Sequence, residues 1–564
     1  MRLFLNQNII HKKNQRNFNA VIISRRLFLI SFLLSILGIV IFSKIFELSI
    51  LNQNKLANSD SIDKKKEYIF RGIVKDRNGK ILATNIFKYK LKAYPKLIKN
   101  PEETAEILKK NIKDLDTNRV IKKISDKSKY EVVIARNITA KKAKYFNSLG
   151  IPGLEFFPAV KRFYPHSNLT SHFVGHTNNS LRGINGIEKT YDEKLSSGKD
   201  ITLSMDLRIQ HAIREELLKD ALTFNSKTAT AILADLNTNE ILAMVSLPDY
   251  NPNLSINPSL SSYRNTATLN LYEMGSTFKI FSLAAGFEYA DLKLNSSFDV
   301  SKPLKISRYT IKDYHPQNKV LSTKEVFLKS SNKGASLIAL KLGGDNLRSF
   351  YNNLGLLDYS LINFIERSKP MYPGKWGDIE TANLSFGYGI SITPIHLIQA
   401  TSLVFSNSKF ENMKLELQKR TNKKHTQFLS DSTKKKLLHL MEENVLKGTG
   451  KNAYVKGYGI GGKTATAEKV IKNEGVYDKR KLVSSFLSIF PIKSPKYICL
   501  VLFDEPFLKN NFKKNDGATG GKTAAKTTSK IIRRIAPLLG IEKKYFYDEM
   551  IVNLEKGDFN LASF

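Results

Sequence analysis

Residues 272–285 read YEMGSTFKIFSLAA, and this stretch is the most informative in the chain. Ser276 and Lys279 stand three residues apart, and the apolar run that follows them predicts a helix. The first turn of such a helix holds both side chains on one face. A serine at a buried helix start gains from the helix dipole, and a lysine beside it in a dry pocket can lose its proton. The stretch therefore indicates a serine nucleophile with a lysine as its base.

The S-x-x-K pattern is weak evidence by itself, because the chain is rich in lysine. The pattern recurs at Ser61, Ser196, Ser330, Ser406 and Ser432. A serine that caps a helix beside a surface lysine is the ordinary alternative. What distinguishes Ser276 is the apolar helix predicted after it.

Two further fragments strengthen the case for a serine enzyme. One is Ser330-Ser331-Asn332, and the other is Lys463-Thr464-Ala465-Thr466. Together with Ser276 and Lys279 they follow the order S-x-x-K, S-x-N and K-[ST]-G of penicillin-binding proteins and serine β-lactamases, with alanine at the final glycine. The Ser330 hydroxyl and the Asn332 amide could relay a proton and hold a substrate amide, although an ordinary Ser/Asn turn is the alternative for this piece alone.

A nucleotide-binding loop is the rival interpretation of the third fragment. Residues 457–464 read GYGIGGKT and satisfy G-x-x-x-x-G-K-[ST], while the apolar run 498–503 ends in Asp504 and Glu505. Such a loop should open a helix, but residues 464–467 lead toward a glycine instead. The predicted location outside the membrane, where ATP is scarce, and the unexplained Ser276 also count against it. A second GGKTA, at 520–524, is expected to open the final helix.

The N-terminus predicts the compartment. Residues 27–46 are apolar or small except for Lys44, which is enough to cross a bilayer once. The segment before it carries the basic residues Lys12, Lys13, Arg16, Arg25 and Arg26. By the positive-inside rule, residues 1–26 form a cytoplasmic tail and the rest lies outside. A cleaved signal peptide is the alternative, but no A-x-A-like site follows, so an uncleaved anchor is favoured.

Beyond the anchor the chain is long enough for two or three domains, and it predicts an α+β fold. We expect a stalk over 47–66 and a β-rich domain over 67–200, in which residues 71–83 form a hairpin around Asn78-Gly79. A second domain over 201–545 mixes a helix at 207–222 with strands at 228–234, 240–246, 482–490 and 497–503, which suggests an antiparallel sheet flanked by helices. Residues 546–564 form a tail.

Charge and cysteine content narrow the functional classes. The net charge is +38, but the lysines are scattered over the whole length and form no single arm, so nucleic acid is not an expected partner. An anionic membrane surface or a carboxylate-rich polymer fits the charge equally well. The lone Cys499 lies in an apolar run, so we expect a small buried side chain.

The motifs resemble the class B penicillin-binding proteins, and the resemblance extends over nearly the whole chain beyond the anchor. It includes residues 234–244, Asn251-Pro252-Asn253, Arg264-Asn265 and residues 272–279. Asn332 in the middle motif, with SFGYGI at 385–390 and Thr393-Pro394, is more similar to the division branch, the FtsI family, than to the elongation branch, which tends to carry Asp there.

This resemblance implies a peptidoglycan D,D-transpeptidase of the division septum, with a pedestal domain at 67–200 and a β-lactamase-like transpeptidase domain at 201–545. Ser276 would attack the bond between two D-alanines of a stem peptide, with Lys279 as base and Ser330 assisting the leaving amine. The N–H groups of Ser276 and Thr466 would hold the oxyanion, while Lys463, Thr464 and the Thr466 side chain would receive the terminal carboxylate.

The family resemblance also implies ligands and partners. β-Lactams would acylate Ser276, and no metal or organic cofactor is needed. A single-pass protein of the inner membrane, with a periplasmic catalytic domain, would pair through its anchor with a lipid II polymerase of the FtsW kind. The pedestal would contact other division proteins.

Departures from the family pattern keep alternatives open. Ala465 replaces the usual glycine on the strand where the substrate backbone pairs, and its Cβ could narrow the groove. Met274 and Asn239 replace a usual proline and a usual glycine. An elongation-type enzyme and an inactive scaffold that only binds division proteins are the alternatives. Asp313 and His315 are expected to form a pair that stabilises a loop near the cleft.

Overall fold

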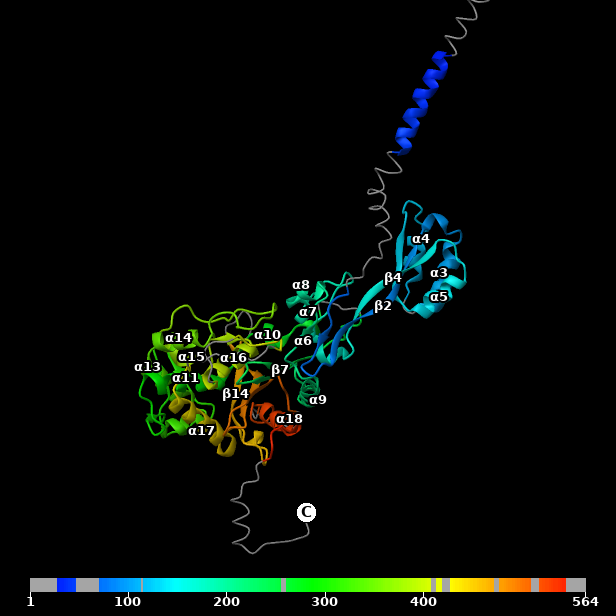
Figure 1. Ribbon diagram of the computed structural model, residues 1–564. Helices are drawn as coiled ribbons and strands as arrows, with labels where there is room; N and C mark the ends of the chain where they lie inside the picture. Colours follow the sequence, from blue (N-terminus) through cyan, green and yellow to red (C-terminus); the bar gives the residue numbers. More distant parts are fainter. Residues whose placement is uncertain are drawn as a thin grey trace, which may run out of the picture. The chain divides into compact units, whose positions relative to one another are not determined.

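A computed structural model describes residues 28–46, 70–112, 115–254, 260–406, 412–417, 427–470, 476–508 and 517–543. The predicted cytoplasmic tail (1–26), stalk (47–66) and C-terminal tail (546–564) lie outside these residues, as does Leu27. The chain divides into two units, residues 1–69 and 70–564. Figure 1 shows the elements with their labels.

The first unit contains one long helix, Phe28–Phe46, of 19 residues with a mean hydropathy of 2.4. All its side chains are exposed. A helix of this length spans roughly 28 Å, close to the hydrocarbon thickness of a bilayer. The helix therefore fits the predicted single membrane anchor.

The second unit begins with a sheet built around the long strand β2 (Ile81–Ala93). β2 pairs with β1 (Val74–Lys75), β3 (Val132–Ile138) and β4 (Leu154–Phe163), all antiparallel, and β1 pairs in parallel with β5 (Ile201–Thr202). The β1–β2 connection is the predicted Asn-Gly turn: Asp76 Oδ1 accepts the N–H groups of Asn78 (2.9 Å) and Lys80 (2.8 Å), and Gly79 has φ +79°. The predicted hairpin is confirmed.

Three helices cover this first sheet: α3 (Pro101–Asn111), α4 (Thr117–Ser125) and α5 (Ala140–Ser148). Each places apolar side chains at helical spacing in one core with the strands, as Leu108, Ile124 and Phe146 show. The region therefore mixes helices with strands.

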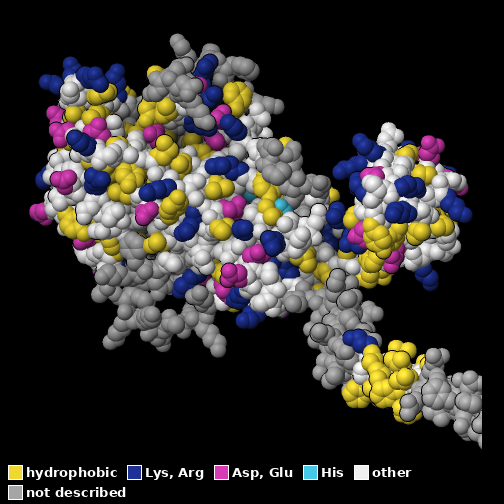
Figure 2. All heavy atoms as spheres, turned by 90° about the horizontal axis from the view of Figure 1, so that it is seen from above, with side chains coloured by type: hydrophobic (Ala, Val, Ile, Leu, Met, Phe, Trp, Pro, Cys, Tyr) yellow, Lys and Arg dark blue, Asp and Glu magenta, His cyan; other side chains and the backbone are white. Residues whose placement is uncertain are grey.

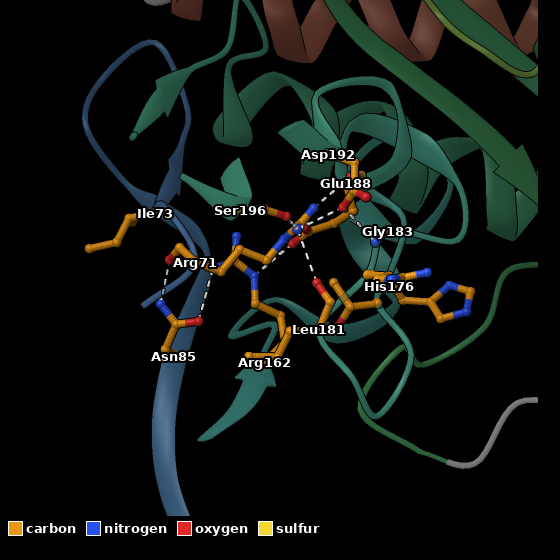
Figure 3. Close-up of polar contacts among 12 residues, drawn as sticks. Arg71, Ile73, Asn85, Arg162, His176, Leu181, Gly183, Glu188, Asp192 and Ser196 are labelled. Carbon is orange, nitrogen blue, oxygen red and sulfur yellow. Dashed lines mark hydrogen bonds and ion pairs between the residues drawn. The ribbon is translucent and has the colours of Figure 1, made fainter. Parts of the chain in front are cut away.

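A buried ion network closes the base of this region (Figure 3). The Glu188 carboxylate accepts from Arg71 Nε at 2.5 Å and from Arg162 Nε at 2.7 Å. Arg71 also contacts Asp192 at 2.7 Å. Glu188, Arg71 and Arg162 are all buried although they come from distant parts of the sequence. The network therefore joins Arg71, Arg162 and Glu188 through their side chains, since no strand pairing connects these three residues to one another.

The part of this unit that follows residue 201 is organised around a five-stranded antiparallel sheet of order β14-β15-β16-β6-β7. Its strands are β6 (Thr228–Asp235), β7 (Ile241–Leu247), β14 (Gly461–Val470), β15 (Tyr477–Phe490) and β16 (Tyr497–Asp504). The four predicted strands are confirmed, and β14 adds a fifth. The sheet joins residues near 230–247 to residues near 461–504.

Helices cover both faces of this sheet, so its strands are buried on two sides (Figure 1). Along β6, Ala231 and Leu233 pack in one core with α9 (Leu207–Thr223) and α18 (Ala524–Leu538), whereas Ile232 packs in the other. That second core contains α11 (Lys279–Tyr289), α13 (Asn332–Leu342), α16 (Pro394–Phe405) and most of α17 (Asp431–Lys447). The alternation follows the two-residue period of a strand. The predicted α+β fold is confirmed.

The remaining elements are short. They are η3 (Pro95–Leu97), η4 (Ser167–Thr170), α6 (Ser171–Val174), α7 (Gly186–Thr190), α8 (Asp192–Ser196), η5 (Ser261–Tyr263), α10 (Thr266–Leu269), β8 (Tyr272–Glu273), η6 (Gly275–Phe278), β9 (Ser297–Asp299), β10 (Leu304–Ile306), β11 (Tyr309–Ile311), β12 (Val320–Ser322), α12 (Thr323–Lys329), α14 (Gly344–Asn353), α15 (Asp378–Leu384), β13 (Ser391–Ile392) and η7 (Lys451–Ala453).

Cys499 is fully buried in the core beside α9 and α18, as expected. On the face shown in Figure 2, Lys and Arg side chains lie scattered among acidic and neutral ones, which matches their scatter along the sequence.

Candidate active site

Ser276 lies in the 3-10 turn η6, directly before helix α11. We expected it in the first turn of the α-helix itself, and that detail is wrong: Gly275 enters with φ +50° and the turn closes more tightly. In a 3-10 turn, side chains three residues apart are aligned. Lys279 Nζ accordingly lies 2.9 Å from Ser276 Oγ.

The Lys279 amine is fully buried and has four close partners. Its Nζ lies 2.7 Å from the Ser330 carbonyl oxygen, 2.8 Å from Asn332 Oδ1 and 3.2 Å from Ser330 Oγ, besides Ser276 Oγ. Loss of hydration lowers the pKa of Lys279 well below its usual value, and the nearby Lys463 lowers it further, while Asp313 opposes the shift. These surroundings favour a neutral amine.

A neutral amine has two hydrogens and one lone pair, which limits how the contacts can be shared. The Ser330 carbonyl and Asn332 Oδ1 can only accept, so they take the two hydrogens. The lone pair is then directed at Ser276 Oγ, whose O–H donates to it. Lys279 is therefore placed to remove the proton of Ser276.

The loop after α12 brings Ser330 into the same cluster. Ser330 caps α12 in the left-handed conformation (φ +57°, ψ 40°), and its Oγ lies 2.9 Å from Ser276 Oγ. Asn332 is the first residue of α13. The middle motif is thus a helix-to-helix junction, and its tight turn aims Ser330 and Asn332 at Lys279.

Asp313 holds this junction in place. Its Oδ2 accepts from Ser331 Oγ (2.8 Å), and its Oδ1 accepts the N–H groups of Asn332 (2.6 Å) and Lys333 (2.9 Å). A carboxylate is favourable at the start of α13, where backbone N–H groups lack helical partners. The expected pairing with His315 is wrong, since Asp313 binds the junction and the His315 ring contacts Tyr314.

Lys463 approaches the cluster from β14. Its Nζ donates to Ser330 Oγ at 3.0 Å and to the Thr464 carbonyl at 3.2 Å, and the Phe327 ring lies 5.6 Å away. Its side chain is fully buried, and loss of hydration lowers its pKa to about 7. Lys463 therefore changes between its charged and its neutral form near neutral pH.

Lys463 also decides against the nucleotide-binding alternative. Residues 461–470 pair with β15 as a strand, and no helix begins at Thr464. The lysine contacts a serine hydroxyl from another motif. The GGKTA at 520–524 does precede α18, as expected.

The side chains of Thr464, Ala465 and Thr466 alternate across β14. The Thr464 hydroxyl lies 2.6 Å from the Thr449 hydroxyl, and Thr466 Oγ1 accepts from Gly520 N at 3.0 Å. The Ala465 side chain points to the other face of the strand, toward Gly275. A Cβ added at Gly275 would lie 3.6 Å from the Ala465 Cβ. The structure therefore unites Ser276, Lys279, Ser330, Asn332 and Lys463 by direct contacts, whereas the two threonine hydroxyls have other partners.

The backbone of β14 faces Ser276 along one edge. Among the described residues, β14 has only β15 as a neighbour in the sheet. A Cβ added at Gly275 would lie 3.4 Å from the Thr466 carbonyl oxygen, which places that carbonyl on the side away from β15. Because N–H and C=O of one residue share a side of an antiparallel strand, the Thr466 N–H also points that way.

Comparison with known proteins gives the same architecture. Residues 229–533 match the model of the penicillin binding protein transpeptidase domain, and residues 67–205 match the penicillin-binding protein dimerisation domain. The "Probable peptidoglycan D,D-transpeptidase FtsI" of Caulobacter vibrioides is 33% identical over 487 residues, covering 84% of this chain and 82% of the relative. The chain belongs to the penicillin-binding proteins of the transpeptidase family.

More distant relatives of this penicillin-binding protein include another FtsI and a sporulation protein. The "Peptidoglycan D,D-transpeptidase FtsI" of Escherichia coli K12 is 28% identical, over 77% of this chain and 79% of the relative. The "Stage V sporulation protein D" of Bacillus subtilis is also 28% identical, over 85% and 81%. A solved protein of Atopobium parvulum, provisionally described as a peptidoglycan glycosyltransferase, shares the fold with a TM-score of 0.64 at 20% identity, over 84% of this chain and 98% of that one. The class B transpeptidase interpretation is confirmed, and the nucleotide-binding one is wrong.

The structure of this penicillin-binding protein adds a segment that the sequence motifs did not identify as part of the site, residues 385–389. The Ser385 carbonyl accepts from Ser282 Oγ at 2.8 Å, and the Phe386 ring lies 6.0 Å from Lys279 Nζ. The Gly387 carbonyl accepts the Gly275 N–H at 3.3 Å, and a Cβ at Gly387 would clash with the Gly275 carbonyl at 2.3 Å. The two glycines around an aromatic residue in F-G-Y-G were the available signal for such a close backbone approach.

Glu273 connects the same segment to β15. Its Oε1 accepts from Gly389 N at 2.7 Å and from the Tyr477 hydroxyl at 3.1 Å, while Oε2 is buried without a hydrogen-bond partner. Burial raises the pKa of Glu273 to about 7.

Within the described residues, no group of three or more His, Cys, Asp and Glu side chains is arranged to hold a metal ion.

Proposed function

We propose that this protein is a peptidoglycan D,D-transpeptidase that cross-links stem peptides at the division septum through an acyl-enzyme on Ser276. The observation that carries the proposal is the buried Lys279 amine, whose lone pair is left for Ser276 Oγ at 2.9 Å. An unprotonated lysine beside a serine is the arrangement that serine acyl transfer needs when histidine is not used.

The first half of the reaction follows from these contacts. Lys279 takes the proton of Ser276, and the oxygen attacks the carbonyl carbon between two D-alanines. Ser330 Oγ, 2.9 Å from Ser276 Oγ and 3.2 Å from Lys279 Nζ, passes a proton to the departing amine as the C–N bond breaks. An ester on Ser276 and a free D-alanine result.

The second half reverses the roles of these groups. The amine of a neighbouring stem peptide gives a proton back through Ser330 and Lys279 and attacks the ester carbonyl. The C–O bond to Ser276 breaks, and the hydroxyl recovers its proton. No cofactor takes part in this sequence.

β14 and the backbone of Ser276 supply the groups that bind the ligand. The N–H groups of Ser276 and Thr466 stabilise the oxyanion, and Lys463, Thr464 and Thr466 receive the terminal carboxylate, as a β-lactam carboxylate would be received. The Thr464 hydroxyl, which is hydrogen-bonded to the Thr449 hydroxyl here, must then also form a hydrogen bond to the ligand. Ala465, which faces Gly275, tunes the approach of the ligand to this edge.

The septal role, the orientation and the partners belong to the proposal. Asn332 in the middle motif and relatives named FtsI support division, although one relative is named for sporulation. The helix Phe28–Phe46 would anchor the protein in the inner membrane with its N-terminus in the cytoplasm, and would bind a polymerase of the FtsW kind. Residues 67–200 would form the pedestal that contacts division proteins, and residues 201–545 the transpeptidase domain.

The acyl-enzyme is tested with a fluorescent penicillin on the full-length protein in detergent. We expect a single labelled peptide containing Ser276, and no label in Ser276→Ala. The matched control is Ser432→Ala, which removes the serine of another S-x-x-K pattern on the exposed side of α17 and should keep full labelling. Label at a different serine, or label that survives Ser276→Ala, would reject the site.

The septal role is tested in the cell by depletion of the protein and by a fluorescent fusion. If the role is septal, depletion should block division and give filamentous cells, and the fluorescent fusion should lie at midcell. Rounded cells with label along the side wall would support the elongation role instead. A Ser276→Ala protein that rescues depleted cells would support a scaffold without catalysis.

A further inference from the structure

Three residues of β14 direct their backbone polar groups toward the site and away from β15. The Thr464 carbonyl accepts from Lys463 Nζ, and the Thr466 carbonyl faces Gly275. The Glu468 N–H donates to the Tyr388 hydroxyl at 3.1 Å. Positions 464, 466 and 468 have the same parity on the strand, so they form one row of backbone groups along this edge.

The row is closed at Glu468. An edge strand with unpaired N–H groups is a template for another peptide strand, and proteins cover such edges to stop the pairing. Here the Tyr388 hydroxyl occupies the position that the carbonyl of an added strand would take at Glu468. Among the described residues, Thr466 has no comparable side-chain cap on its N–H.

Tyr388 is held firmly enough to act as a stop. Its ring packs 5.5 Å from the Phe386 ring and 5.2 Å from the Tyr477 ring. The residues on either side are fixed by the Gly275–Gly387 and Glu273–Gly389 hydrogen bonds. Burial raises the pKa of Tyr388 to about 12, so the hydroxyl stays protonated at neutral pH.

We infer that Tyr388 is a specificity-determining residue that ends backbone pairing of the acyl donor after Thr466. As a result, residues added at the N-terminal end of a peptide donor do not raise its acylation rate constant. This inference rests on the proposed function, since it concerns the donor of the acylation of Ser276. The ligand class it selects is an acyl-D-alanine donor recognised at its C-terminal end only.

The register of such a donor follows from the proposed binding roles. A donor with its reacting D-alanine opposite Thr466 and its carboxylate end toward Lys463 runs antiparallel to β14. The second residue before the reacting D-alanine then lies opposite Glu468, where it would pair if Tyr388 were absent. In an N-acetylated donor, one added residue already places the acetyl carbonyl opposite the Glu468 N–H, so the ladder hydrogen bond becomes possible with one added residue.

The test compares thioester donors on the full-length protein in detergent. The donors are N-acetyl-D-alanyl thioglycolate and the same thioester extended at its N-terminus by one or two L-alanines. Ser276 attacks the thioester carbonyl, the C–S bond breaks, and the released thiol is measured with a thiol reagent. The readout is the ratio of acylation rate constants for extended and short donors.

In the wild type the ratio stays near one for both extended donors. In Tyr388→Phe, which keeps the ring and removes the cap, one more backbone hydrogen bond raises the ratio about fivefold for both extended donors. Tyr388→Ala should shift the ratio in the same direction. The matched control is Tyr477→Phe, which removes the hydroxyl that binds Glu273 and not β14, and should keep the wild-type ratio.

A ratio in both Tyr388 variants that equals the wild type, or falls below it, would overturn the inference while the proposed function stands. A fivefold rise that also occurs in Tyr477→Phe would overturn it too, because the cap would then not be the cause. If neither penicillin nor any thioester acylates the wild type, the proposed function fails and the inference falls with it.

Discussion

Lys279 and Lys463 approach the same hydroxyl, Ser330 Oγ, at 3.2 and 3.0 Å. Both amines are fully buried, and burial lowers the pKa of each. Two ammonium groups this close would repel each other, and Lys463 indeed contributes to the lowered pKa of Lys279. Lys279 can therefore be neutral while Lys463 is charged, with the Ser330 hydroxyl between them.

This pairing predicts a pH dependence. Lys463 has a pKa of about 7, so its charge is present below pH 7 and is lost above it. The second-order rate constant for acylation by a penicillin, which carries a carboxylate, should fall as the pH rises above about 7. It should also fall at low pH, where Lys279 takes up a proton. Stopped-flow fluorescence with a labelled penicillin measures the profile, and a flat rate up to pH 9 would contradict the role of Lys463.

Replacing Lys279 should slow acylation strongly without unfolding the protein. Lys279→Met removes the proton acceptor of Ser276, and we expect acylation by penicillin to fall by roughly 10²- to 10⁴-fold. Stability should be equal or higher, since a buried amine is replaced by an apolar chain. Lys435→Met is the control, because Lys435 completes another S-x-x-K pattern on the exposed side of α17. Acylation at wild-type rate in Lys279→Met would show that another group is the base.

Asp313 should act on the site through the α12–α13 junction. In Asp313→Ala, three hydrogen bonds to Ser331, Asn332 and Lys333 are lost, and we expect unfolding to become easier by about 1–3 kcal/mol. Acylation should slow about 10- to 100-fold, because Ser330 and Asn332 lose their fixed positions. Denaturant unfolding and penicillin labelling measure the two effects.

The conservative variant separates positioning from general damage. Asp313→Asn keeps one acceptor oxygen for the two N–H groups and should recover most of the acylation rate. His315→Ala, which alters an exposed neighbour, should behave as wild type. An Asp313→Ala protein that melts normally and acylates at full rate would exclude the positioning role.

The buried network of Figure 3 predicts a large stability effect at residues that are not part of the Ser276 cluster. Glu188→Gln leaves the buried guanidinium groups of Arg71 and Arg162 without their shared carboxylate, and should cost about 3–5 kcal/mol. Asp200→Asn is the matched control, since its ion pair with Lys75 is exposed and should be worth no more than about 1 kcal/mol. Denaturant unfolding of both variants tests the contrast, and equal losses would mean that burial does not set the cost.

Much of the fold follows from local sequence. The short apolar run along β6 and the helical spacing in α9 predicted these elements at nearly their observed bounds. The Asn-Gly turn predicted the first hairpin because Gly79 accepts a positive φ. The local pattern of β14 did not predict a strand, since its glycines and its lysine resemble a phosphate-binding loop. The family resemblance alone implied a strand at Ala465, and its pairing with β15 is not visible locally.

The sequence by itself determined the order of the three motifs, the apolar periods and the anchor helix, because these depend on residue type and spacing along one chain. Only the tertiary structure decided that two lysines share one serine, that Asp313 holds the middle motif and that Tyr388 covers the end of β14. These relationships join residues 133, 18 and 80 positions apart. Burial of an amine and the direction of a hydrogen bond exist only when such distant segments meet, so no local pattern can specify them.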